Sequence, residues 1–335
     1  MWSPAVVPSI VRATPISCIS PIPMPPSTPD LSVIIVSYNT RDLLRECLQS
    51  LRSSGGSVSW EVIVVDNASS DGSAEMVRAE FPEVCLIANS DNRGFGAGCN
   101  QGLVRATGRY ALLLNADIRA TEGAIERLVA FMDTHPEFVA CGGQLRYPDG
   151  RLQPSCASEL TLWAVFCEQT MLEKLFPRTR LFGGYWRTWW DFSRTIETEQ
   201  VMGACMMLRR QPDGTFPLFD EDYFLYCEDT DLCFRLRQAG GKIAYVHDAV
   251  FVHALGASGA PRRAEMVLYY NRGKERFFRK FYGVGHARLC YGLNQMGALL
   301  RMLMGLGLTL LTVGRVPRFR TYFKTFWQVL WRKSR

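Results

Sequence analysis

The feature that most constrains the fold of this 335-residue chain is the alternation of short apolar runs with helical patterns between residues 31 and 141. Short β-branched runs of this kind are typical of buried strands. The predicted strands are 31–37, 61–65, 84–88, 110–114 and 138–141, and the predicted helices are 41–51 (capped by Thr40), 73–80, 97–106 and 121–132. Such alternation predicts parallel βαβ units. We therefore expect an α/β fold with a Rossmann-like, mostly parallel sheet flanked by helices.

The remaining segments differ in character. Residues 1–30 are rich in proline, which predicts a disordered segment without a secretory signal, with Met24 as an alternative start. Residues 145–200 are aromatic-rich and irregular, whereas 201–208, 242–246 and 250–253 are apolar runs, the last two predicted as short strands. We expect four parts: 1–30, the two halves 31–143 and 144–260 of one domain, and a helical, basic extension at 261–335.

Charge is distributed unevenly along the chain. The last 60 residues, from Arg276 to Arg335, hold 12 Lys/Arg and no Asp/Glu, which leaves 26 basic against 32 acidic residues in the rest. An acidic body with a basic tail indicates an acidic partner for the tail, either anionic lipid or nucleic acid. The 11 cysteines form no C-x-x-C pair, and we interpret them, including Cys85 and Cys205, as small buried hydrophobes in a reducing compartment.

Polar residues follow four of the predicted strands. In parallel sheets, ligands bind outside the carboxyl ends of the strands. The polar clusters at these ends are 38–39, 66–67, 89–94 and 115–117. They predict a ligand-binding edge of the sheet.

Two aspartates follow the second strand. Asp66 at the strand end can accept a hydrogen bond from a base or a ribose hydroxyl, or it can belong to a turn. For Asp71, we favour a turn or helix-capping role. The glycine-rich segment 92–98 lacks G-x-G-x-x-G spacing, but it can place backbone N–H groups and Arg93 near a phosphate.

Asp117 and His253 each follow an apolar strand. Carboxylate oxygens bind Mg²⁺ or Mn²⁺ against a diphosphate, so Asp117 is a candidate metal ligand; the alternative is a solvated loop carboxylate. A single histidine at a strand end, such as His253, is more often structural than a ligand.

An acidic cluster, Glu228, Asp229 and Asp231, opens a predicted helix at 232–238. One reading is helix capping by Asp229. One cap needs one carboxylate, however, and the neighbouring aromatic residues indicate an apolar wall. Burial and like charge would raise the pKa of a carboxyl here toward neutrality, which suits a general base.

Taken together, these segments resemble glycosyltransferase family 2, whose members have the GT-A fold. The matching segments are 36–39, 65–73, 92–102, 114–117, 203–210, 228–235 and 252–253. The resemblance covers about residues 31–260, and the ordered set is far more specific than any one motif. The asparagine-rich versions of the motifs look most like rhamnosyltransferases of polysaccharide assembly.

The resemblance implies roles for individual residues. Tyr38 and Asp66 would hold the nucleoside, Asp117 and His253 would bind the metal, and Asp229 would be the catalytic base. Asn115 replaces the first aspartate of the family's D-x-D motif. The full implied donor-binding set is Ser37, Tyr38, Asn39, Asp66, Asn67, Arg93, Gly94 and Asn115, with Glu228 and Asp231 as a supporting acidic cluster.

The resemblance further implies an inverting transfer that uses Mn²⁺ or Mg²⁺. The donor would be a nucleotide-diphosphate sugar, with dTDP-rhamnose the best match, and the acceptor a hydroxyl of a glycan or lipid-linked molecule in cell-surface polysaccharide assembly. A nucleotide-sugar pyrophosphorylase is an alternative, but it would need a glycine-rich basic loop after the first strand. A non-catalytic membrane or sugar-binding scaffold is another, and it would have no use for the clustered carboxylates.

The C-terminal region is apolar as well as basic. Arg301 interrupts the apolar run 298–311, and the uncharged stretch 302–314 is shorter than the roughly 20 residues that span a bilayer. Interleaved cations and aromatic rings after residue 315 suit a lipid headgroup layer. We therefore expect a cytoplasmic protein that is peripheral on the membrane and does not bind nucleic acid; a helical pair packed on the catalytic domain is the alternative.

Overall fold

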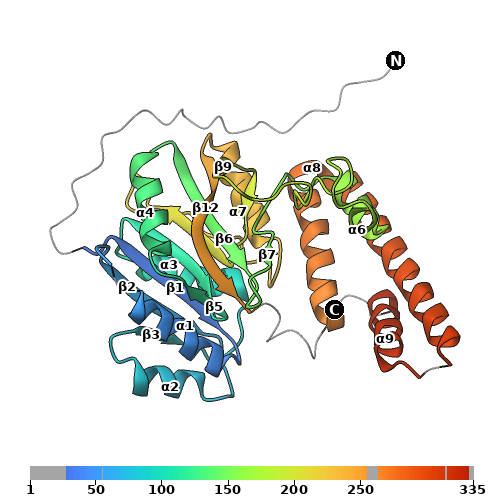
Figure 1. The fold of residues 1–335 in the computed structure, drawn as a ribbon, viewed down its shortest axis with the longest axis horizontal. Coiled ribbons are helices and arrows are strands. Elements are labelled where there is room, and N and C mark those ends of the chain that lie inside the picture. The colour runs from blue at the N-terminus through green and yellow to red at the C-terminus, as the bar shows by residue number, and fades with distance from the viewer. Residues whose placement is uncertain (1–27, 55, 255–262, 314, 332–335) are drawn as a thin grey trace.

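The computed structural model describes residues 28–54, 56–254, 263–313 and 315–331, and it contains a large mixed sheet with helices on both faces (Figure 1). The strands are β1 (Leu31–Ser37), β2 (Trp60–Asp66), β3 (Cys85–Ala88), β4 (Tyr110–Asn115), β5 (Ile118–Ala120), β6 (Phe138–Arg146), β7 (Leu152–Gln153), β8 (Cys156–Ala157), β9 (Ile196–Glu197), β10 (Gln200–Val201), β11 (Cys205–Arg209) and β12 (Lys242–His253). The helices are α1 (Arg41–Ser53), α2 (Ser73–Glu80), α3 (Phe95–Arg105), α4 (Ala124–Thr134), α5 (Leu162–Gln169), α6 (Leu172–Leu175), α7 (Glu228–Gln238), α8 (Arg263–Leu311) and α9 (Pro317–Trp331).

The main sheet has the strand order β3-β2-β1-β4-β11-β6-β12-β5. Its first four strands are parallel, β11 runs antiparallel between β4 and β6, and β12 is parallel to β6. Both faces of the parallel half are buried, because Val33 and Ile35 join one core cluster and Ile34 joins the other. The expected mostly parallel α/β fold is therefore confirmed.

Several expected elements differ in detail. The run 201–208 forms two strands, β10 and β11, because residues 202–204 leave the ladder; the runs 242–246 and 250–253 form one strand, β12, with a register shift between Val246 and Val250. The three-residue β5 has too short a pattern to predict. Thr40 is at the N-cap position of α1, but its hydroxyl bonds Ser37 and makes no cap hydrogen bond in the described structure.

The predicted burial of the cysteines is confirmed for most positions and wrong for one. All ten cysteines in the described residues are free thiols, and Cys205 is buried. Cys85, by contrast, is exposed, because β3 is the edge strand of the sheet. The predicted disorder of residues 1–30 concerns a segment of which all but residues 28–30 lie outside the described residues.

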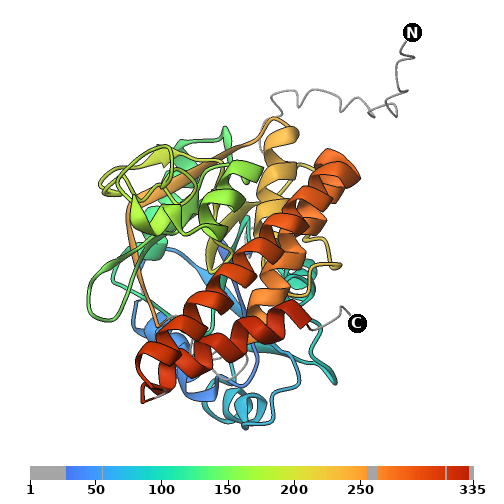
Figure 2. The same ribbon diagram turned by 90° about the vertical axis from the view of Figure 1, so that its right-hand side faces the viewer.

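Helices α8 and α9 form the expected helical extension (Figure 2). A left-handed residue, Gly283 with φ +87°, divides α8 into two helical halves, and α9 packs against the second. Gly305 permits this close packing, because a Cβ there would lie 2.9 Å from the backbone nitrogen of Phe323. Across the described ranges, none of the helices combines the length and apolarity needed to cross a membrane.

Candidate active site

The polar clusters predicted from the sequence gather at one edge of the sheet. Parallel pairing places Ser37 beside Asp66, and Val36 beside Asn115, at the carboxyl ends of β1, β2 and β4. The structure thus brings the first, second and fourth clusters to a common edge, as the rule for parallel sheets predicts.

Asp66 is buried, with 3% of its surface exposed, and its two oxygens have different environments. Oδ2 accepts a hydrogen bond from the Ser69 N–H at 3.0 Å, whereas the buried Oδ1 has no partner among the described residues. A buried carboxylate oxygen without a donor is costly, so the site favours a ligand that supplies an N–H or O–H group.

The loop after β1 is held by hydrogen bonds to the loop after β2. Asn39, with φ +53°, donates its backbone N–H to Ser69 Oγ at 2.9 Å and accepts the Ser70 N–H at its side-chain oxygen at 2.8 Å. Asparagine tolerates this left-handed conformation better than most residues. Ser37 is buried and bonds Thr40, while Tyr38 is partly exposed between them. Asn39 thus shapes the loop that presents Tyr38.

Asp71 has the structural role expected of it. Its carboxylate accepts the Arg41 N–H at 2.8 Å and the Ser73 N–H at 3.1 Å, so it satisfies the first turns of α1 and α2 together. This contact explains why the Thr40 hydroxyl is not needed as a cap.

Asn67 fixes the glycine-rich loop. Its amide nitrogen donates to the Gly94 carbonyl at 2.9 Å, and its oxygen accepts from Asn89 at 2.9 Å. Gly94 has φ +88°, and a Cβ there would lie 2.3 Å from the Phe224 carbonyl oxygen, so only glycine fits. Arg93, next to it, is exposed and available to a phosphate.

Asp117 and His253 meet where β5 pairs with β12. Asp117 Oδ1 lies 3.1 Å from His253 Nε2, and both side chains are largely buried. His253 Nδ1 lies 3.1 Å from the Gln153 oxygen. With that oxygen as acceptor, Nδ1 carries the proton and Nε2 presents its lone pair toward Asp117, which is the tautomer that a metal-binding histidine needs.

The spacing of this pair suits a divalent cation. Adjacent ligands of an octahedral ion, each about 2.1 Å from it, are about 3.0 Å apart. One oxygen and one imidazole nitrogen suit Mn²⁺. In the part of the chain that the structure describes, no group of three or more His, Cys, Asp or Glu gathers at a metal-like spacing. The protein therefore offers two candidate donors here, and the remaining ligands of such an ion would have to come from elsewhere, for example from phosphate oxygens.

Asp229 is at the start of α7, directly beside the segment that follows β10. Its Oδ2 accepts the Gly203 N–H at 3.0 Å, and its Oδ1 accepts the Thr230 N–H at 2.8 Å. The carbonyl oxygen of Ala204, the residue after Gly203, accepts the Asn115 N–H at 2.9 Å. This hydrogen bond connects the Asp229 surroundings to the end of β4. Burial raises the pKa of Asp229, and the two backbone donors oppose that rise only in part.

The two other acidic residues of the cluster have different surroundings. Glu228 is buried, and its Oε2 has no partner among the described residues; burial, and then the charge of Asp229, raise its pKa well above the ordinary value. Asp231 points elsewhere: it is fully buried and bonds Arg235 at 2.6 Å and Lys280 at 2.7 Å. Asp231 therefore joins α7 to α8, and the structure does not bring it to Glu228 and Asp229 as expected.

Sequence reasoning missed three contributors. Gly203 supplies a backbone N–H to Asp229, Gln153 orients His253, and the first half of α8 packs against the turn before Asp229. Gln153 and α8 carry no local signal, because their partners are 100 and 43 residues distant in sequence. Gly203 opens a segment that was recognised, but nothing in the sequence indicates that its N–H would be used.

Comparison with known proteins places these residues in a family context. The sequence model described as Glycosyl transferase family 2 matches residues 32–189. The chain is 28% identical over 238 residues to N-acetylglucosaminyl-diphospho-decaprenol L-rhamnosyltransferase of Mycobacterium tuberculosis (strain ATCC 25618 / H37Rv), which covers 67% of this chain and 75% of that protein.

Solved structures agree on the fold. Mannosyltransferase PcManGT from Pyrobaculum calidifontis, in complex with GDP-Man and Mn²⁺, has a TM-score of 0.52 at 18% identity and covers 94% of this chain and 90% of its own. GalNAc-T7 with UDP, GalNAc and Mn²⁺ has a TM-score of 0.50 at 15% identity, over 76% of this chain and 50% of its own. These likenesses confirm the GT-A fold with its C-terminal helices.

Proposed function

Because residues 32–189 match the glycosyl transferase family 2 model, we propose that the chain is an inverting, metal-dependent glycosyltransferase whose catalytic base is Asp229. The observation that carries the metal requirement is the separation of 3.1 Å between Asp117 Oδ1 and His253 Nε2. The observation that carries the base is the placement of Asp229, with a raised pKa, beside the end of β4.

The donor-binding proposal rests on a buried hydrogen-bond acceptor at the sheet edge that has no donor among the described residues. The nucleoside would donate a hydrogen bond to Asp66 Oδ1, which has no partner among the described residues, and would pack near Tyr38. Arg93, which is exposed, and the backbone at Gly94 would bind a phosphate of the donor. Asn115, the residue that precedes Ala116 and Asp117, would complete the donor side with an amide in place of a carboxylate.

Asp117 and His253 would hold Mn²⁺ or Mg²⁺, and the ion would supply positive charge to neutralise the departing diphosphate. The acceptor hydroxyl attacks the anomeric carbon from the face opposite the diphosphate, and its proton moves to Asp229. The bond from the anomeric carbon to the phosphate oxygen breaks, and its electron pair leaves with the nucleoside diphosphate. One displacement inverts the anomeric centre without a covalent enzyme intermediate.

The neighbouring Glu228 supports this role for Asp229. Its buried position and raised pKa favour the neutral form, so that Asp229 is the carboxylate that ionises first. Two ionised carboxyl groups side by side would be unfavourable in such an environment.

For the substrates, we propose dTDP-rhamnose as donor and a lipid-linked glycan hydroxyl as acceptor. The support is the similarity to the mycobacterial L-rhamnosyltransferase, whose name gives a diphospho-decaprenol acceptor. The asparagine-rich motifs of this chain point in the same direction.

A lipid-linked acceptor agrees with a peripheral membrane contact through the α8–α9 hairpin, which we include in the proposal. The hairpin exposes large apolar side chains at its tip, with Leu310, Leu311 and Val313 exposed by 68%, 82% and 81%. The following exposed cations are Arg315, Arg318, Arg320 and Lys324. Each cation near an anionic surface contributes roughly 1 kcal/mol to binding. This combination favours an anionic membrane on the cytoplasmic side.

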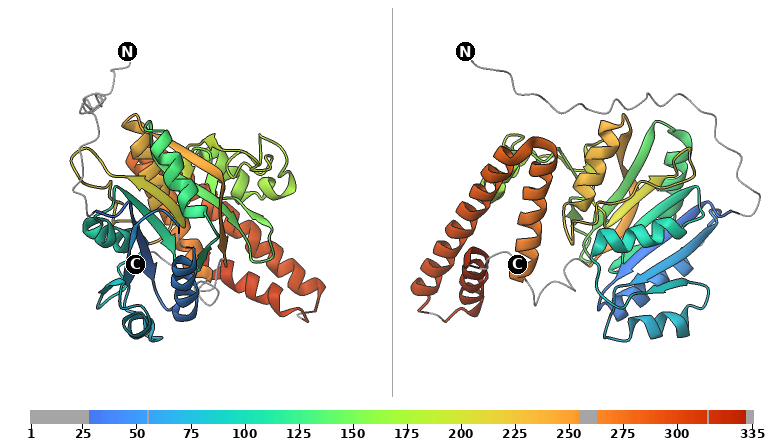
Figure 3. Two further views of the ribbon diagram at one scale, coloured as in Figure 1. Left: turned by 60° about the vertical axis from the view of Figure 1, so that its left-hand side comes forward. Right: turned by 180° about the vertical axis from the view of Figure 1, so that it is seen from behind.

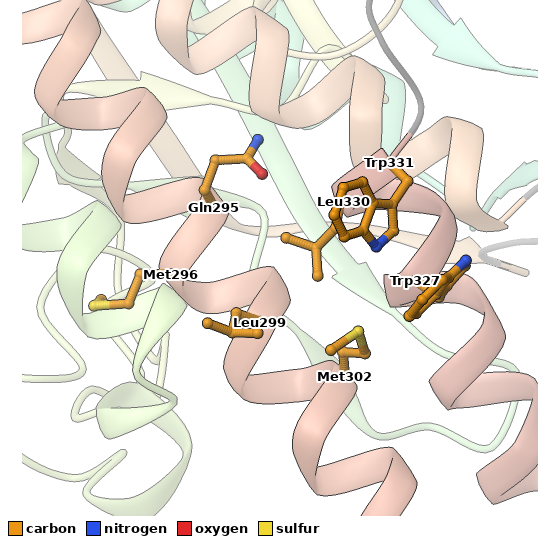
Figure 4. Close-up of a pocket in the computed structure, with 7 residues that line it drawn as sticks. All are labelled: Gln295, Met296, Leu299, Met302, Trp327, Leu330 and Trp331. Carbon is orange, nitrogen blue, oxygen red and sulfur yellow. The ribbon is translucent and has the colours of Figure 1, made fainter.

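A groove between the two helices adds apolar surface to the hairpin (Figure 4). It has a volume of about 330 Å³ and is lined by Gln295, Met296, Leu299, Met302, Trp327, Leu330 and Trp331. The packed-helix alternative explains part of the hairpin, since Arg301 is buried and donates to the Gln169 carbonyl at 2.9 Å. It does not explain the exposed leucines at the tip.

The experiment that tests the function is a transfer assay with a panel of dTDP-, UDP- and GDP-sugars, with Mn²⁺, Mg²⁺ or EDTA. The acceptor is a short-chain N-acetylglucosaminyl-diphospho-prenol in detergent. We expect metal-dependent transfer, fastest with dTDP-rhamnose, and a product with the inverted anomeric configuration by NMR. Transfer that persists in EDTA, or a product with retained configuration, would reject the proposed mechanism.

A further inference from the structure

The first half of α8 lies along the segment that leads into α7 (Figure 3). Its contact residues recur every three or four positions and therefore form one face of the helix. They are Tyr269, Tyr270, Gly273, Arg276, Phe277, Lys280 and Phe281. A long helix outside the recognised motifs thus contacts the part of the chain that carries Asp229.

The segment before Asp229 contains an unfavourable turn. Tyr226 and Cys227 have φ angles of +70° and +68°, so two consecutive residues with full side chains adopt the left-handed conformation. Such residues carry steric strain and persist where the surrounding structure holds them. Glu228 and Asp229 follow immediately, so the turn determines where α7 begins and where Asp229 points.

The contact that holds this turn is made by the backbone of α8 at Gly273. A Cβ at this position would lie 2.6 Å from the Tyr226 carbonyl oxygen and 3.0 Å from Cys227 Cβ. The Cys227 thiol lies 3.9 Å from the Tyr270 carbonyl oxygen, and the rings of Tyr226 and Tyr270 are 5.9 Å apart. A side chain at 273 would have to displace the backbone of the turn.

Ion pairs and contacts between aromatic rings hold the same face of α8 on the far side of the turn. Lys280 lies 2.7 Å from both Asp220 and Asp231, and the ring of Phe234 lies 4.4 Å from that of Phe281. The helix therefore cannot slide away from α7 to accommodate a larger residue at 273. The turn, and not the helix, would move.

We propose that Gly273 is a positioning residue, through which α8 holds the Tyr226–Cys227 turn and thereby aims the carboxylate of Asp229. The inference rests on the proposed role of Asp229 as the base. It assigns a positioning function to the first half of α8, a helix that begins after the recognised motifs end.

The test compares two glycine-to-alanine variants on the same helix in the full-length protein. Gly273→Ala introduces the clash, whereas Gly292→Ala is a matched control, because nothing in the described structure lies within 4 Å of a Cβ at 292. We expect kcat of Gly273→Ala to fall about 10- to 100-fold, since small misplacement of a catalytic group has that effect. The KM for the donor and the Kd for its nucleoside diphosphate should change less than about twofold, because the contacts that bind the donor equally in the ground state and the transition state are not altered. Gly292→Ala should retain the kcat of the natural protein.

A double variant shows whether the loss acts through the base. If Gly273→Ala acts by misplacing Asp229, adding it to Asp229→Asn should cause little further loss in kcat. Losses that multiply, or a Gly273→Ala variant as active as Gly292→Ala, would overturn the inference while leaving Asp229 as the base. Near-normal turnover of Asp229→Asn alone would instead overturn the base itself.

A second variant covers the case in which Gly273→Ala does not fold. Tyr270→Leu removes the ring that contacts Tyr226 without introducing bulk against the turn. Its kcat should fall several-fold at unchanged donor affinity. Unchanged kcat in a folded Tyr270→Leu protein would count against the inference.

Discussion

The two halves of α8 differ in composition and in environment, because residues 263–282 hold eight Lys, Arg or Glu residues and residues 284–311 hold two. Before Gly283, Phe277 and Phe278 are buried and Lys274 is fully enclosed, paired with Glu168 at 2.8 Å. After Gly283, the helix is rich in leucine, and Leu310 and Leu311 are exposed at its end. The comparison teaches that composition alone does not predict burial, because the more charged half buries its phenylalanine rings whereas the more apolar half leaves leucines exposed.

The reason for the difference is what each half has to pack against. The first half lies beside α7 and the irregular region around α5, which supply rings and carboxylates. The second half leaves the sheet; near its start it packs against α5 and against the first half of α8, where Asn294 donates to Glu275 at 2.8 Å, and α9 covers it farther along (Figures 1 and 3). Its remaining face has no partner among the described residues, and the proposed membrane would supply one.

The largest effect should come from the site beside the first half. Asp229→Asn keeps size and polarity but cannot accept the acceptor proton, so kcat should fall by about two orders of magnitude or more. Donor binding by calorimetry and vesicle binding through the hairpin should survive. An Asp229→Asn variant with near-normal turnover would contradict the assignment of Asp229 as the base.

Loss of a metal donor should come next. Asp117→Asn replaces a charged oxygen ligand with a neutral one and should weaken Mn²⁺ binding at least about tenfold, as ligand-shell changes do. The measurement is Mn²⁺ titration by electron paramagnetic resonance with the nucleoside diphosphate present. Glu122→Gln removes an exposed carboxylate nearby and is the control. Equal Mn²⁺ affinities in both variants would contradict the metal role.

The pH dependence of kcat should report the raised pKa of Asp229. The base acts when it is deprotonated, so kcat should fall as the pH falls through its pKa, by about tenfold per unit below it. Because burial raises that pKa, the fall should begin above the pH expected for an ordinary aspartate. A rate that stays constant down to the ordinary range near pH 4 would contradict the assignment.

The hairpin should show its effect on membranes and not on the chemistry. Replacing Leu310, Leu311 and Val313 together by asparagine should weaken binding to anionic vesicles at least about tenfold, because exposed apolar area is lost from the interface. Val104→Asn, an equally exposed position on α3, is the control. Transfer to a detergent-solubilised acceptor should remain unchanged. Vesicle binding that is equal in all variants, or absent at low salt, would favour the packed-helix alternative.

The smallest effect concerns the stability of the helix pair itself. Gly292→Ala should raise the free energy of unfolding by about 0.5–1 kcal/mol, because alanine restricts the unfolded chain and favours the helix. Gly305→Ala should lower it, since its Cβ would lie 2.9 Å from the Phe323 backbone. Chemical denaturation compares the two. The same sign for both variants would mean that α9 does not pack on α8 as described.

Much of the site could be predicted because it depends on short-range patterns. Apolar runs that end in polar residues predicted where β1, β2 and β4 stop, and parallel pairing then placed Asp66 and Asn115 at one edge. The turn-forming residues around Asp71 likewise predicted its capping role. Cys85 was predicted wrongly, because local apolar sequence does not reveal that β3 is an edge strand.

The sequence by itself determined the order of the main strands and helices and the family that the chain resembles, because backbone geometry repeats every two or 3.6 residues and the motifs are local. Only the tertiary structure decided which partners each carboxylate of the acidic cluster meets. Asp229 and Asp231 are two residues apart, yet one meets the Gly203 N–H and the other meets Lys280 from α8. Partners so distant along the chain are brought together by packing, and no local pattern encodes them.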